Sequence, residues 1–271
     1  IRYLMRHRHT TPFEMVEFKF HCKMPIFVAR QWVRHRTANI NEYSLRYSEA
    51  RDEFYYPDPD NIEFQSALNK QGRMGEVDSE LKEKVQKYFK EISERSFAIY
   101  SELNDAGVAR ELARAILPVN LYTEWYWKND LHNLLHFIGL RSDGHAQYEI
   151  RVFSDAMASF VKNVAPFAWE AYQDYVVKGM RFSKIAQSLL EKNLPDRVID
   201  DIQEDLAYQL TASLHINKPR SDEDLFPLYK DQGGTDSIED FNLKWTSGEI
   251  DTGNVRELRE FKSKIETLRQ S

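Results

Sequence analysis

The chain has 271 residues, of which 42% are hydrophobic and 30% charged, as is ordinary for a globular protein. A formal net charge of −6 argues against broad nucleic-acid binding, and the single cysteine excludes an intramolecular disulfide and a multi-cysteine metal site within one chain. No apolar run reaches the roughly 20 residues of a membrane helix and no signal peptide opens the chain, so we expect a cytosolic protein.

The N-terminal part predicts two helices around a strand. Residues 1–9 have a helical pattern, and we expect the natural N-terminus upstream because the sequence opens inside that pattern. A proline should interrupt the chain at 10–14. Apolar and polar side chains then alternate over 15–23, which is typical of a half-buried strand. The next helix is predicted over 25–34, with Pro25 in its first turn.

The middle of the chain predicts loops followed by helices. The polar stretch 37–48 should form a loop that leads into a short strand, and 50–75 is rich in proline and glycine and indicates irregular structure. Residues 79–104 have the pattern of a long amphipathic helix. A second helix is expected between Gly107 and Pro118.

The last elements complete an α+β prediction. Residues 119–127 have the composition of a strand, and Asp130 is a candidate N-cap for a helix over 131–140. Two more amphipathic helices are predicted at 145–163 and 166–178. The fold expected is a set of helices packed around a small, mostly antiparallel sheet.

The composition changes near residue 185. The tail is polar, contains several prolines and a glycine pair, and ends in a charged helical pattern near 254–269. We therefore predict a single catalytic domain over 1–184 and a helical C-terminal extension over 185–271.

The segment 30–46 carries the densest chemical signal. It contains four arginines and one histidine, interleaved with side chains that donate and accept hydrogen bonds: Arg30, Gln31, Arg34, His35, Arg36, Asn41, Glu42, Ser44 and Arg46. Guanidinium groups match phosphate oxygens, so this mixture suits a nucleotide. No glycine-rich phosphate loop is present, so arginines would have to replace backbone amides. A solvated loop with surface ion pairs is the alternative.

Two further clusters contain arginine. Arg114 lies at an apolar helix end, where its charge needs either a ligand anion or a structural carboxylate. The segment 141–147 brings Arg141, Asp143 and His145 to a predicted junction between two helices, where Asp143 could simply cap the second helix.

Two other functions remain open from the residues alone. His132 and His136 stand four residues apart on a predicted helix with His145 nearby, as in a metal-dependent hydrolase, although position 133 is Asn and no H-E-x-x-H motif is formed. A nucleic-acid-binding module could use the arginines together with the fourteen tyrosines.

Arg34-His35-Arg36, followed by Ser44 and Arg46, resembles the R-H-R-x(7)-S-x-R signature of flavin-dependent thymidylate synthases. Four flanking blocks resemble that family in the same order, and the resemblance covers about residues 1–180: His9–Glu14, Pro25–Trp32, Leu117–Tyr122 and Arg141–Gln147. Asn39 stands where the family usually has serine, and it keeps a hydrogen-bonding side chain.

The resemblance implies an enzyme that methylates dUMP to dTMP, with FAD as cofactor and NADPH and methylenetetrahydrofolate as co-substrates. It also implies a homotetramer with sites at subunit interfaces. The implied FAD residues are His9, Thr11, Arg34, His35, Arg36, Glu42, Asp130, His132 and His136. The implied dUMP residues are Gln31, Arg34, Glu42, Ser44, Leu45, Arg46, Arg114 and Arg141, with Arg141 also the catalytic residue beside the uracil ring.

The one cysteine is not expected to act as a nucleophile. Cys22 falls on the apolar face of the alternating strand with Phe18 and Phe20, where a thiol has a raised pKa. Ser44 has no evident base in its segment, so we interpret it as a nucleotide ligand.

Overall fold

The computed structural model describes residues 1–66, 72–180 and 182–186. Two compact units divide the chain between Gly179 and Met180, and the features below belong to the first unit. The predicted extension at 185–271, with its helix near 254–269, lies outside the described residues except for positions 185 and 186. Its assignment as a C-terminal extension stays a prediction.

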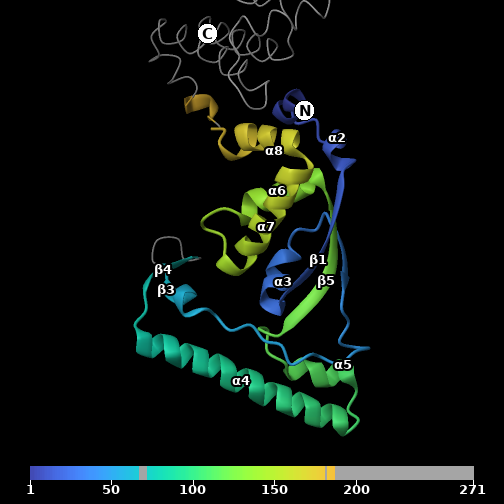
Figure 1. Ribbon diagram of the computed structural model, residues 1–271, viewed down its shortest axis with the longest axis vertical. Coiled ribbons are helices and arrows are strands. Elements are labelled where there is room, and N and C mark those ends of the chain that lie inside the picture. Colours follow the sequence, from blue (N-terminus) through green and yellow to red (C-terminus); the bar gives the residue numbers. More distant parts are fainter. Residues whose placement is uncertain (67–71, 181, 187–271) are drawn as a thin grey trace, which may run out of the picture. The chain divides into compact units, whose positions relative to one another are not determined.

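A three-stranded antiparallel sheet organises the first unit. Its strand order is β1 (Glu17–Pro25), β5 (Tyr122–Asp130), β2 (Asn39–Glu42). The two long strands, β1 and β5, pair along their whole length (Figure 1). A separate pair is formed by β3 (Glu63–Gln65) and β4 (Arg73–Glu76). The predicted α+β class with a small antiparallel sheet is confirmed.

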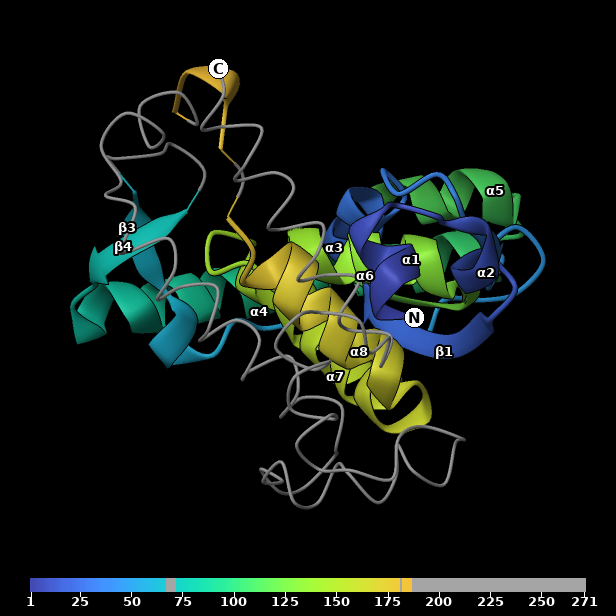
Figure 2. The ribbon, with the colours of Figure 1, turned by 90° about the horizontal axis from the view of Figure 1, so that it is seen from above.

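Helices cover one face of this sheet and continue beyond it. In Figure 1 α3, α6 and α7 lie on the same side of β1 and β5, and Figure 2 shows α8 following α7. Their bounds are α1 (Arg2–Arg6), α2 (Thr11–Glu14), α3 (Ile26–Trp32), α4 (Ser79–Asp105), α5 (Arg110–Ala113), α6 (Leu131–Arg141), α7 (Tyr148–Val164) and α8 (Pro166–Tyr172), with short turns η1 (Pro59–Asn61), η2 (Arg114–Ile116) and η3 (Gln173–Val177). Within the described residues no helix is both long enough and apolar enough to cross a bilayer.

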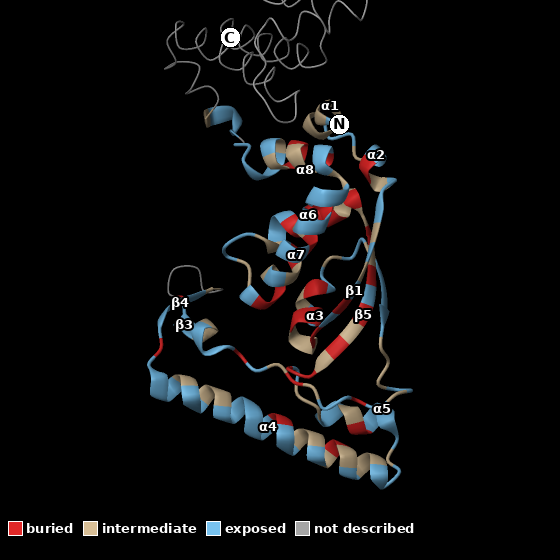
Figure 3. Cartoon of the chain, viewed as in Figure 1, coloured by how far each residue is buried: buried red, intermediate tan, exposed pale blue. Residues whose placement is uncertain are grey.

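The alternation of β5 explains which face is covered. Thr123, Trp125, Trp127 and Asn129 are buried, whereas the residues between them are exposed or half-buried. Figure 3 shows the buried residues concentrated on the two long strands and the helices that face them. Period-two burial of this kind places one face of the strand on the core.

Trp32 is the centre of that core. Its fully buried ring meets Trp125 and Trp127 edge-on at centroid distances of 5.5 and 5.4 Å and stacks on Phe137 at 4.9 Å. Aromatic rings bury large apolar areas and prefer such geometries. The last residue of α3 is therefore fixed against both β5 and α6.

Cys22 lies in this core, as predicted. It is buried opposite Trp125 in the ladder, and burial raises the pKa of its thiol to about 11. The thiol is therefore protonated at neutral pH, and a protonated thiol is a poor nucleophile.

Several predicted boundaries were wrong for local reasons. The expected break at 10–14 is the short helix α2, because Pro12 sits in its first turn, where the missing N–H costs nothing. Pro25 ends β1 and is the N-cap residue of α3 rather than part of its first turn. The helix expected after Gly107 is one α-helical turn, α5, followed by the tighter turn η2 ahead of Pro118.

Two boundaries moved because of turns and pairing. The stretch 37–48 holds β2 near its start, since residues 39–42 pair with β5. The helix predicted from residue 145 begins at Tyr148, because Asp143 accepts hydrogen bonds from the backbone of His145 and Ala146 and forms a turn there.

Candidate active site

The arginine-rich segment leaves α3 through a tight turn. The backbone N–H of His35 donates to the carbonyl of Trp32 at 2.9 Å, directly after the buried tryptophan. Arg34 and Arg36 are exposed on either side, and neither side chain forms a hydrogen bond or ion pair with another described residue. The fold thus presents two uncompensated guanidinium groups from one anchored turn, as a phosphate site requires.

His35 is half-buried and contacts a distant motif. Arg141 Nε donates to His35 Nε2 at 2.9 Å, and the ring packs edge-on against Phe137 at 4.8 Å. Burial, then the charge of Arg141, then His136 lower the pKa of His35 to about 4. The imidazole is therefore neutral near pH 7, with Nε2 as the acceptor and the proton on Nδ1.

The contact with His35 orients Arg141 without neutralising it. Burial lowers the pKa of Arg141, but a guanidinium stays charged in proteins. Its terminal nitrogens make no hydrogen bond to any described residue. The end of α6 therefore carries a fixed cation that can stabilise negative charge on a ligand.

The strand β2 leads to the second part of the signature. At its end Glu42 accepts a hydrogen bond from Thr123 Oγ1 on β5 at 2.6 Å, and the N–H of Tyr43 donates to the carbonyl of Glu124. Ser44 Oγ then accepts from the backbone of Arg46 at 3.4 Å. The half-buried Leu45 packs on a second, smaller cluster of buried residues, which holds the loop in place; its members are Ala50, Phe54, Tyr100, Ala113 and Leu121.

Two exposed ion pairs join this loop to α5. Arg46 pairs with Glu111 at 3.0 Å, and Arg110 pairs with Glu49 at 2.8 Å. Arg114 begins η2 one turn after Glu111 and is half-buried. No described carboxylate pairs with Arg114, so the structure does not support a carboxylate of the same chain as its partner. We therefore keep the interpretation that Arg114 binds a ligand anion.

The site residues form two groups in one chain. His35, His136 and Arg141 lie together, since the His35 and His136 rings are 6.3 Å apart. The residues 42–46 and Arg114 adjoin α5. No hydrogen bond, ion pair or ring contact joins these two groups within the described part of the chain. Gln31, which precedes both groups in the sequence, has a buried side-chain oxygen that no described donor satisfies.

The remaining predicted cofactor residues are spread over three elements. His9 is exposed with its ring 5.8 Å from that of Tyr3, and Thr11 opens α2. Asp130 is the predicted N-cap of α6, which is confirmed: its carboxylate accepts from both the backbone and the side chain of Asn133. That carboxylate is thus occupied within the chain, and His132 is half-buried on the same helix.

The geometry does not support a metal-dependent hydrolase that uses His132, His136 and His145. His145 is exposed and bonded to Asp143 at 2.8 Å. Among the residues described, no three histidine, cysteine, aspartate or glutamate side chains are placed to hold a metal. The alternative role of Asp143 as a helix cap is wrong, because the N-cap residue of α7 is Gln147.

One polar cluster was missed by sequence reasoning. The buried carboxylate of Glu149 in the first turn of α7 pairs with Arg73 and accepts from Tyr55. An acid at a helix start is a common surface feature, so its type and position gave no signal of burial. The only available clue was that Glu149 lies two residues beyond the block ending at Gln147.

Comparisons with known protein sequences point to one family. The family described as thymidylate synthase complementing protein matches residues 1–167. A flavin-dependent thymidylate synthase of Rickettsia conorii is 50% identical over 205 residues, covering 71% of this chain and 70% of the relative. One of Ehrlichia ruminantium (strain Gardel) is 53% identical over 192 residues, covering 71% and 65%, and one of Dictyostelium discoideum is 46% identical over 195 residues, covering 72% and 64%. The chain thus spans about two thirds of the length of these curated relatives.

Two solved structures are similar to this chain in fold and in sequence. A UMP/dUMP methylase, PolB from Streptomyces cacaoi, bound with 5-Br UMP, has a TM-score of 0.60 and 34% identity, covering 63% of this chain and 80% of that one. The same methylase bound with 5-Br dUMP gives a TM-score of 0.59 and 33% identity, covering 64% and 78%. Since the family match spans more than half of the chain and includes the anchored arginine turn, the chain belongs to the thymidylate synthase complementing protein family.

Proposed function

We propose that this chain is a flavin-dependent thymidylate synthase that converts dUMP to dTMP with methylenetetrahydrofolate as carbon donor and NADPH as reductant. The observation that carries the proposal is the hydrogen bond from Arg141 to His35, the residue that stands between the unpaired arginines Arg34 and Arg36 in the chain. The names of the relatives support it, and so does the nucleotide bound by the methylase of similar fold. A cytosolic location belongs to the same proposal.

The donor set fits a flavin dinucleotide. Two unpaired guanidinium groups and a neutral imidazole that offers Nδ1–H match the charge and hydrogen-bonding needs of a diphosphate. FAD would be held by these groups together with His9, Thr11, Glu42, His132 and His136, with Asp130 contributing mainly through its helix cap. Bound FAD supplies the reducing equivalents, which no side chain can carry.

The nucleotide would be bound by charge at one end and oriented at the other. Arg46 and Arg114 adjoin α5 and suit the 5′-phosphate, with Ser44, Leu45 and Glu42 beside them. Gln31 offers an unsatisfied buried acceptor, and Arg34 an unpaired cation. Arg141, fixed by His35, would stabilise negative charge that develops on the uracil ring and favour ionisation at N3.

No cysteine takes part in this mechanism. The only thiol is protonated in the core, away from the arginines, and Ser44 has no base bonded to its hydroxyl in the described chain. Activation of the pyrimidine therefore falls to electrostatics and to the reductant.

We propose a homotetramer with its sites at subunit interfaces. No hydrogen bond, ion pair or ring contact joins the two groups of site residues within the part of the chain that the structure describes, so a neighbouring copy would bring the loop 42–46 to the turn 34–36 of its partner. Exposed apolar side chains on α4, such as Tyr88 and Ile92, offer surface for such packing.

The absorbance spectrum of the purified protein tests the proposal. We expect a yellow protein that binds FAD non-covalently and forms dTMP from dUMP when NADPH and methylenetetrahydrofolate are supplied. A colourless protein that takes up no added FAD and forms no dTMP would overturn the assignment.

A further inference from the structure

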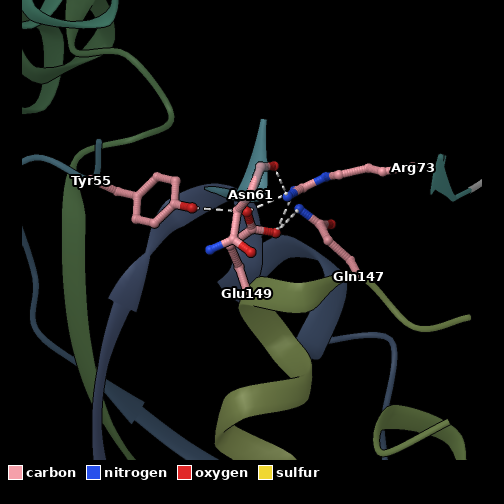
Figure 4. Close-up of polar contacts among 5 residues, drawn as sticks. All are labelled: Tyr55, Asn61, Arg73, Gln147 and Glu149. Atoms are coloured by element: carbon pink, nitrogen blue, oxygen red, sulfur yellow. Dashed lines mark hydrogen bonds and ion pairs between the residues drawn. The ribbon is translucent and has the colours of Figure 1, made fainter. Parts of the chain in front are cut away.

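A buried carboxylate lies outside the residues used above. Glu149 is the second residue of α7 and is only 5% exposed. Figure 4 shows its carboxylate meeting three side chains: Arg73 Nη2 donates to its two oxygens at 2.6 and 2.7 Å, Tyr55 OH at 2.8 Å and Gln147 Nε2 at 2.9 Å. Burial alone would raise the pKa of Glu149, but these bonds outweigh it and hold the pKa below its usual value. The group is therefore an ionised acceptor at neutral pH.

The donors to Glu149 are themselves fixed. The backbone N–H of Tyr55 donates to the carbonyl of Asn120 at 2.8 Å, and the Asn120 amide returns a bond to the carbonyl of Tyr55 at 3.0 Å. The Tyr55 ring packs edge-on against Phe27 of α3 at 5.5 Å. Arg73 Nη1 also donates to the carbonyl of Asn61 at 2.8 Å. Glu149 thus connects α7 to the segment that packs on α3, the helix leading to His35.

The loop that follows Arg141 is bonded to the same helix. Ser142 Oγ lies 2.8 Å from Ser154 Oγ, and Arg151 Nη1 donates to the carbonyl of Gly144 at 3.1 Å. The third connection is the Gln147 amide on Glu149. Since an ionised carboxylate can only accept, the amide must turn its nitrogen toward Glu149. The loop 142–147 therefore moves with the first turns of α7.

We propose that Glu149 is a positioning residue for the nucleotide site. Its carboxylate fixes the loop 142–147, and with it Arg141, at a set distance from α3 and the His35 turn. The inference rests on the proposed function only for the identity of the ligand that the site binds. A pair of well-packed apolar residues would hold α7 as strongly, so the directional bonds of the ion pair point to orientation rather than to stability.

Glu149→Gln is the decisive variant, because it keeps the size of the side chain and replaces one acceptor oxygen with a donor that faces Arg73 and Gln147. Val161→Ala is the matched control: Val161 is fully buried near the other end of α7, and its truncation lowers stability without touching the cluster. Glu149→Asp keeps the charge and serves as the rescue. All three are compared with the wild-type protein at matched fractions folded.

Two readouts separate positioning from the proposed function. Amide hydrogen exchange of residues 142–147 needs no ligand, and we expect it to rise about tenfold in Glu149→Gln but to stay unchanged in Val161→Ala. Affinity for dUMP, measured by calorimetry, should fall by about tenfold to a hundredfold in Glu149→Gln, while FAD affinity stays within a factor of about two. Glu149→Asp should recover part of both losses.

Equal exchange in Glu149→Gln and wild type, or equal exchange in Glu149→Gln and Val161→Ala, would overturn the proposal. Failure of the wild-type protein to bind dUMP would instead contradict the proposed function and leave the exchange comparison decisive for Glu149. Should Glu149→Gln not fold, Tyr55→Phe removes one donor and keeps the ion pair. Unchanged exchange in that variant would also overturn the proposal, and a rise of about threefold would support it.

Discussion

Two kinds of arginine in the described part of this chain differ in where their counter-charge lies. Arg73 of β4 pairs with a buried carboxylate of its own chain in α7 and also donates to the carbonyl of Asn61. Arg34, Arg36 and Arg114 have no such partner among the described residues, and Arg141 is held by a neutral imidazole. An arginine whose partner is a buried carboxylate builds the scaffold, whereas one left unpaired, or paired only at the surface as Arg46 is, stays available to a ligand anion.

Removal of Arg73, the arginine that pairs with a buried carboxylate, should have the largest effect. Arg73→Met leaves Glu149 charged and buried, so we expect a loss of about 4 kcal/mol in the free energy of unfolding. Arg110→Met is the control, because its ion pair with Glu49 is exposed and should contribute less than about 1 kcal/mol. Denaturant unfolding measures both, and equal losses would remove the distinction.

Arg141→Ala tests the cation that is oriented but not neutralised. We expect kcat/KM to fall by about 3 kcal/mol of transition-state stabilisation, since a fixed charge near the uracil ring is lost. FAD binding and the melting temperature should be nearly unchanged, unlike in Arg73→Met. Near-normal turnover would take Arg141 out of the mechanism.

Arg46→Ala tests the proposed phosphate end of the site. The loss of a charge-assisted bond should weaken dUMP by about 2 kcal/mol and deoxyuridine, which lacks the phosphate, far less. The broken pair with Glu111 is exposed and should contribute little to stability. Calorimetric titration with both ligands decides, and equal losses would move Arg46 away from the phosphate.

Cys22→Ser tests whether the buried thiol takes part in catalysis. A hydroxyl buried beside Trp125 should cost about 1 kcal/mol of stability, while turnover is retained. Thermal unfolding and the dTMP assay measure the two effects. A variant that folds, binds FAD and dUMP normally, and yet forms no dTMP would contradict a mechanism without a cysteine nucleophile.

Neutral His35 should make the stability of the fold depend on pH. Its folded pKa of about 4 lies below the ordinary value of 6.5, so between these values the unfolded chain binds more protons. The stability contributed by neutral His35 is complete above pH 6.5 and is lost as the pH falls toward 4. Melting temperatures over that range should fall less steeply in His35→Gln, which can still accept from Arg141. Parallel curves would show that His35 does not titrate there.

The sequence by itself determined the antiparallel strand pattern, the long helix α4 and the cap at Asp130, because these depend on neighbours a few residues apart. Alternation over 15–23 places one face of β1 on the core whatever covers it. The signature Arg34-His35-Arg36 also identified the family, because residue spacing within one short segment can be read from the sequence alone. Boundaries moved where a proline or a turn was accommodated locally, as at Pro12 and Asp143, and where strand pairing decided the span, as for β5, which was predicted at 119–127 and lies at 122–130.

Only the tertiary structure decided which charges are free. The bond from Arg141 to His35 spans 106 positions and that from Arg73 to Glu149 spans 76, so neither pairing has a local pattern. Burial then sets their chemistry: desolvation keeps His35 neutral, and three donors keep Glu149 ionised. An isolated arginine looks the same in sequence whether its partner is a distant carboxylate or a ligand, because charge compensation depends on folding that brings remote segments together.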